Sequence, residues 1–113
     1  MGGSALLPKV FQQVGTHAPD VRDTGTIKAY FNGCKKLREL EIIHAYHDRS
    51  EGGLFTTIIE RAFAGRVGVD IKVKDYAAGI YPQNIIAAFL NEELGAVFQV
   101  SESNLGAFED VFR

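Results

Sequence analysis

The sequence predicts a single α/β domain, and three observations indicate this class. The segment 27–37 repeats apolar residues at helical spacing, as in a helix with one buried face. The segment 67–73 alternates valine or isoleucine with other residues, which is typical of a strand with one buried face. The length of 113 residues suits one domain of common size, and we expect residues 1–113 to form it.

In the first half of the chain, we expect two helices followed by a strand. Ser4 can cap a helix that runs to about Val14, and Asp23 or Thr24 can cap the amphipathic helix. Leu40 to Tyr46 is short, apolar and rich in isoleucine, which favours a buried strand over another helix.

Glycines and a proline divide the second half into elements. Gly65 and Gly95 each follow an apolar helical pattern and are natural helix stops. We expect a helix over 54–64, a strand over 67–73, an irregular connector over 75–81, a helix starting at Pro82, a strand over 96–100 and a last helix capped by Ser103.

Composition excludes several classes of partner. The formal charge of −2, from 12 basic and 14 acidic residues, predicts no nucleic acid partner. No stretch is long and apolar enough to span a membrane, and the first residues lack the pattern of a secretory signal. Cys34 is the only cysteine, so no internal disulfide can form, and we expect a reducing, cytoplasmic location.

The segment 46–54 is the strongest candidate for a binding site. Polar residues at the carboxyl end of a strand lie where α/β sheets usually hold ligands. Gly52 and Gly53 permit close backbone approach, and the helix that follows offers free N–H groups to an anion such as phosphate. Asp48 offers Mg²⁺ a hard oxygen. Ser50 can donate to a phosphate oxygen, and Arg49 can pair with one.

The same residue types also suit a purely structural turn. Ser50 can be the N-cap of the next helix, and Asp48 can bond its own backbone. The spacing is not that of a Walker A loop, because no Gly-Lys-Ser/Thr follows. From the residues alone, both a ligand site and a capped structural turn stay open.

Other chemically capable residues favour structural roles. His44 and His47 should face opposite sides of a strand, which argues against a shared metal; His44 would pack on the sheet and His47 would lie nearer a ligand. Cys34 lies on the apolar face of its helix. Glu92 and Glu93 most simply finish a helix and bridge to neighbouring loops. No convincing nucleophile–base pair is present, so we assign no catalytic residue.

Three ordered motifs at 45–54, 60–65 and 91–100 resemble the phosphoribosylformylglycinamidine synthase family. They are similar to the carboxyl-terminal part of the second synthetase half in its long single-chain members. The resemblance implies an aminoimidazole-ribonucleotide-synthetase-like C-terminal domain, in which helices are layered against a mixed sheet. It also implies that the chain stops before the last strands of that domain.

The resemblance further implies an ATP-dependent ligase of purine biosynthesis. The family converts formylglycinamide ribonucleotide, ATP and glutamine into formylglycinamidine ribonucleotide, ADP, phosphate and glutamate. It implies Mg²⁺ bound by Asp48 and ATP or ADP contacted by Ser50, in a site that is either reactive or auxiliary. We expect Gly52 and Gly53 of the same turn to bind that nucleotide through their backbone. The implied partners are an upstream synthetase domain, which carries the other Mg²⁺ ligands, and a glutaminase domain, which supplies ammonia.

A fragment of such a ligase should be inactive alone. We expect it to self-associate through the uncovered edge of its sheet. The alternative is a small stand-alone binding or interaction module without catalysis. The gene distinguishes the two: a reading frame that continues well past Arg113 supports the fragment, and a stop codon there supports the module.

Overall fold

The structure is a computed structural model, and it describes residues 4–15, 17–73 and 85–113. The chain divides into two compact units. One combines residues 1–20 with 48–97, and the other combines residues 21–47 with 98–113. Each unit is described by itself below.

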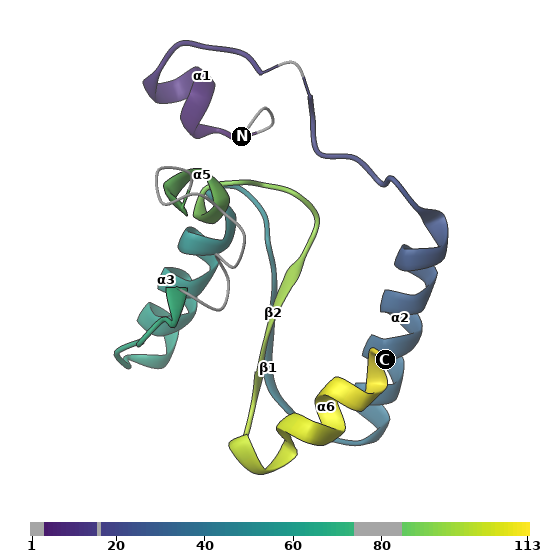
Figure 1. Cartoon of the computed structure of the whole chain (residues 1–113). Helices are drawn as coiled ribbons and strands as arrows, with labels where there is room; N and C mark the ends of the chain where they lie inside the picture. Colours follow the sequence, from purple (N-terminus) through teal and green to yellow (C-terminus); the bar gives the residue numbers. More distant parts are fainter. Residues whose placement is uncertain (1–3, 16, 74–84) are drawn as a thin grey trace. The chain divides into compact units, whose positions relative to one another are not determined.

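The only two strands of the described residues pair with each other. Strand β1 (Ile43–Asp48) and strand β2 (Ala96–Val100) run antiparallel (Figure 1). The second unit adds helix α2 (Thr24–Glu39), the 3₁₀ turn η2 (Glu102–Asn104) and helix α6 (Leu105–Val111). The described part of the chain therefore confirms the α/β class, with a two-stranded antiparallel sheet where a mixed sheet was expected.

Helix α2 starts where the sequence predicts. The carboxylate of Asp23 accepts hydrogen bonds of 2.9 Å from the backbone N–H groups of Gly25 and Thr26, which confirms Asp23 as the cap. The Thr26 hydroxyl also donates to Asp23, and these bonds lower the pKa of that carboxyl from its ordinary value. The predicted stripe is only partly buried, since Leu37 is fully buried whereas Phe31 is 65% exposed.

Aromatic rings hold the second unit together. Phe98 of β2 packs against Tyr46, Phe108 and Phe112, with ring centroids 5.1, 5.3 and 6.2 Å away. Gly33 of α2 faces the ring of Phe112, and an added Cβ there would lie 2.4 Å from a ring carbon. The absence of a side chain at Gly33 therefore lets α6 approach α2 closely.

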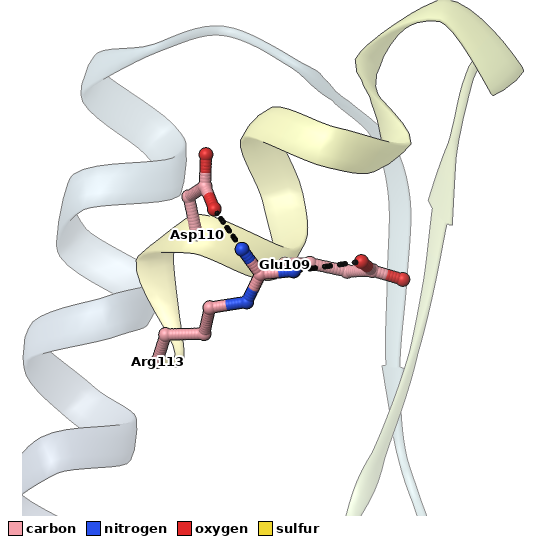
Figure 2. Close-up of polar contacts among 3 residues, drawn as sticks. All are labelled: Glu109, Asp110 and Arg113. Carbon is pink, nitrogen blue, oxygen red and sulfur yellow. Dashed lines mark hydrogen bonds and ion pairs between the residues drawn. The ribbon is translucent and has the colours of Figure 1, made fainter.

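Ion pairs close the carboxyl end of α6. Arg113 donates to the Asp110 carboxylate at 2.8 Å and lies 3.7 Å from a Glu109 oxygen (Figure 2). The Arg113 side chain is 74% exposed, so water screens both pairs and each adds little stability.

Three described helices belong to the first unit: α1 (Leu6–Val10), α3 (Gly53–Gly65) and α5 (Ile85–Phe89). Helices α3 and α5 pack against each other, and Phe89 is 8% exposed. The buried hydroxyl of Thr57 donates to the Gly53 carbonyl one turn earlier, so this polar group is satisfied inside the helix. These contacts support the start of α3, where the candidate site lies.

Several predicted boundaries are wrong by a few residues. The first helix ends at Val10 and not at Val14, because Gln12 takes a positive φ of 52° that breaks the helix. The strand predicted from Leu40 begins at Ile43, because Glu41 also has a positive φ, and its residues alternate in exposure. The last helical segment begins at Glu102, so Ser103 lies within its first turn and does not cap it.

The strand predicted over 67–73 is wrong. Residues 67–72 form no regular element, and Val67 and Val69 are 63% and 51% exposed. An alternating pattern stabilises a strand only if a neighbouring strand accepts and donates its backbone hydrogen bonds. No such neighbour exists among the described residues, whose two strands pair with each other.

Two expectations fall outside the described residues: the irregular connector over 75–81 and the helix start at Pro82. The helix over 54–64 and the strand over 96–100 are confirmed, as α3 and β2. Within the described ranges, no helix is long and apolar enough to cross a membrane.

Candidate functional site

Strand β1 ends at Asp48 and presents that side chain on its exposed face. Exposure alternates along the strand, so Tyr46 and Asp48 share the exposed face while His47 is half-buried on the other. Ser50, two residues beyond Asp48, is also exposed. The expectation that His44 packs on the sheet is wrong, because His44 lies on the exposed face too.

The turn after Ser50 depends on two glycines. Gly52 and Gly53 have φ values of 85° and 69°, a left-handed backbone that side chains disfavour. The N–H of Gly53 donates to the Ser50 carbonyl at 3.0 Å and closes the turn. Gly52 is the N-cap of α3 and no side chain caps the helix, so the interpretation of Ser50 as the N-cap is wrong.

Gly53 lies against the end of α5. An added Cβ would lie 2.6 Å from the Phe89 carbonyl oxygen and 2.8 Å from that of Asn91. The close backbone approach that the sequence predicts at this glycine is therefore made by the chain's own backbone.

Arg49 anchors the turn to the loop that precedes β2. Its backbone N–H donates to the Gly95 carbonyl at 2.8 Å, and its guanidinium donates to the carbonyls of Glu93 and Leu94. Gly95 leaves room for this side chain, since a Cβ there would lie 3.2 Å from the guanidinium. In this arrangement Arg49 positions the loop, and the expectation that it pairs with phosphate is not supported.

Glu92 ties three segments of the first unit together. One carboxylate oxygen, Oε1, accepts the N–H of Ala5 at 2.8 Å and that of Gly52 at 2.9 Å. The prediction that Glu92 bridges to neighbouring loops is confirmed. The sequence could not name its partners, because they lie 87 and 40 residues away and no local pattern marks either of them.

The turn offers a metal only part of a coordination shell. The described ranges contain no group of three or more His, Cys, Asp or Glu residues that could hold a metal ion. Mg²⁺ commonly takes one or two protein carboxylates and completes its shell with water and phosphate oxygens. Asp48 and Ser50 are both exposed and lie two residues apart, so they fit one wall of such a site and leave further ligands to be supplied from elsewhere.

Cavities of the first unit lie at other residues. One of about 660 Å³ is lined by Ile59, Phe63 and Val67, among others. A second, of about 420 Å³, has an entirely apolar lining that includes Phe55 and Phe89. Neither lining contains Asp48 or Ser50, so these two residues are no part of either cavity.

A family match covers the entire chain. The model of the AIR synthase related protein, C-terminal domain, matches residues 1–113. The chain belongs to this family. It is also similar to the phosphoribosylformylglycinamidine synthases of Saccharomyces cerevisiae, at 42% identity over 113 residues, and Schizosaccharomyces pombe, at 37% over 110 residues. These alignments cover 98% and 97% of this chain, and it spans about 8% of each relative's length.

The match confirms the resemblance that the three sequence motifs indicated, together with the family's α/β domain type.

Proposed function

We propose that this chain is one domain of a phosphoribosylformylglycinamidine synthase, a glutamine-dependent ligase of purine biosynthesis that consumes ATP. The similarity to two enzymes of that name over nearly the whole chain supports this proposal. In the longer ligase the domain would work with an upstream synthetase domain and a glutaminase domain in the cytoplasm. Its own contribution is one wall of a site for Mg²⁺ with ATP or ADP.

The observation that carries the site proposal is the exposure of both Asp48 and Ser50. Both side chains are exposed, two residues apart, where β1 passes into the glycine turn that starts α3. Mg²⁺, when bound with a nucleotide, neutralises phosphate charge. Asp48 would ligate that ion and Ser50 would donate its hydroxyl to a phosphate oxygen. The positive end of the α3 dipole favours the same anion.

Gly52 and Gly53 would contribute to the same site. Both N–H groups already have partners within the chain, so the proposed role of the glycines is to fix the turn that presents Asp48 and Ser50. Direct contact between either glycine and the nucleotide stays a prediction. Whether the complete site is reactive or auxiliary depends on residues outside this chain.

Isothermal titration with Mg²⁺-ADP tests the proposal. The 113-residue chain should give a weak or silent titration, because one carboxylate does not hold Mg²⁺ and a nucleotide together. The longer protein should bind, and Asp48→Asn should abolish that binding by removing the charged ligand. Asp70→Asn, which removes a carboxylate outside the turn, is the matched control and should bind normally. Unchanged binding by Asp48→Asn would remove Asp48 from the metal site.

Self-association of the isolated chain through the uncovered edge of its sheet is a second part of the proposal, and exposed apolar side chains elsewhere would add to it. Apolar side chains of α3 stay exposed along one side of the helix: Phe55, Ile59 and Phe63 are 48%, 49% and 85% exposed and recur every four residues. Apolar surface of this kind favours association. Light scattering at increasing concentration should show species above the mass of a monomer.

A further inference from the structure

We propose that Glu92 is a positioning residue of the candidate nucleotide site, and that it couples the turn to the segment before α1. The identity of the ligand in this inference rests on the proposed function. The positioning geometry is independent of that function, since the two hydrogen bonds to Glu92 Oε1 are formed within the chain itself.

The first step concerns the place that Glu92 occupies. Gly52 is the N-cap of α3, so its N–H lies at the start of the helix, where the sequence predicts an anion. In the structure the anionic group at that N–H is the Glu92 carboxylate, 2.9 Å away. This bond fixes the Gly52 backbone, whose φ of 85° sets the direction of the turn.

The second step concerns the direction in which the turn is fixed. The N–H groups of Gly52 and Gly53 both bond within the protein, to Glu92 and to the Ser50 carbonyl. Asp48 and Ser50, which flank Arg49, are both exposed. Glu92 therefore acts on the site through the backbone, by fixing the turn that follows Asp48 and Ser50, and does not itself contact the nucleotide.

The third step concerns the coupling. The same oxygen accepts the N–H of Ala5, which precedes α1 (Leu6–Val10). A backbone N–H bonded to a carboxylate is held more strongly than one bonded to a neutral acceptor. Because one atom serves both donors, loss of Glu92 should release Ala5 and Gly52 together.

Amide hydrogen exchange of the 113-residue chain, followed by NMR, tests the geometry. Glu92→Ala should raise exchange at both Ala5 and Gly52 by about tenfold or more, because both lose a charge-assisted bond. Glu92→Gln should keep much of the protection, since its amide oxygen still accepts. Glu93→Ala removes the same charge from a neighbour that is also half-buried, and should leave both amides unchanged. Exchange that rises at one amide alone, or equally in Glu93→Ala, would overturn the coupling.

Glu92→Asp replaces Glu92→Ala if the latter unfolds. It keeps the charge but shortens the side chain by one methylene, so exchange should rise at both Ala5 and Gly52 while the rest of the fold stays protected. Unaltered protection at both amides in Glu92→Asp would count against the inference.

Nucleotide affinity in the longer protein tests the consequence. Glu92→Ala should weaken Mg²⁺-ADP binding by about 10- to 100-fold, the usual effect of removing a group that orients metal ligands. Glu92→Gln should recover most of the affinity, and Glu93→Ala should match the wild type. Tighter binding by Glu92→Ala would show that Glu92 blocks the turn, and would refute the positioning role. Absence of binding in the wild type would refute the proposed function while leaving the exchange result to judge the geometry.

Discussion

Gly53→Ala gives the most specific structural prediction, because the added methyl group is destabilising for two independent reasons. The φ of 69° places an L side chain in the left-handed region, at a cost of about 1–2 kcal/mol. The new Cβ would also lie 2.6 Å from the Phe89 carbonyl oxygen and 2.8 Å from that of Asn91. These atoms are backbone, so relief requires α3 and the end of α5 to separate, and overpacking of this kind costs about 1–3 kcal/mol.

Gly53→Ala should therefore lower the free energy of unfolding by about 2–5 kcal/mol, a large share of the stability of an ordinary domain. Urea unfolding followed by circular dichroism at 222 nm measures the change. Gly106→Ala is the matched control, since an added Cβ there meets nothing within 4 Å. It should be neutral or should stabilise α6 by up to about 1 kcal/mol. Equal unfolding free energies for the wild type and Gly53→Ala would refute this account of the turn.

Three further predictions concern other parts of the chain. The depressed pKa of Asp23 means that its contribution to stability is fully present above the ordinary value of 3.8 and is lost as pH falls through the lower folded value. Circular dichroism at 222 nm, followed as the pH is lowered, should show this loss of helix stability in the wild type. Asp23→Asn still caps α2 but has no carboxyl to titrate, so it should not show the loss. Identical pH dependence in the two proteins would contradict the prediction. Arg49→Lys should lower the free energy of unfolding, measured in urea, by about 1–3 kcal/mol. The planar guanidinium donates to the carbonyls of both Glu93 and Leu94, and a lysine ammonium group cannot reproduce that geometry. A midpoint equal to that of the wild type would argue against this anchor. Phe63→Glu, at an 85% exposed position, should shift the light-scattering mass toward the monomer, whereas unchanged association would place the interface elsewhere.

Local signals in the sequence predicted the elements that local chemistry determines. Asp23 caps α2 through N–H groups two and three residues away, and the strand expected over 96–100 is present as β2. The segment 67–73 shows the limit of this approach. Its alternating residues would give a strand one apolar face, but the alternation does not show whether a partner strand is present.

The candidate site shows the same division. The sequence placed the strand end within two residues and the start of α3 within one, and it marked the two glycines between them. It could not show that Arg49 bonds carbonyls more than 40 residues away, or that Glu92 holds Ala5 and Gly52. Those contacts depend on how distant segments meet, and no local spacing encodes that meeting.

The central claim is that Asp48 ligates a nucleotide-bound cation in the longer ligase. Crystals of that protein grown with Mn²⁺ and ADP would locate the ion through its anomalous scattering. The account predicts a peak about 2.1 Å from a carboxylate oxygen of Asp48, with the Ser50 hydroxyl facing a phosphate. A fully occupied metal–nucleotide site with Asp48 outside its coordination shell would contradict it.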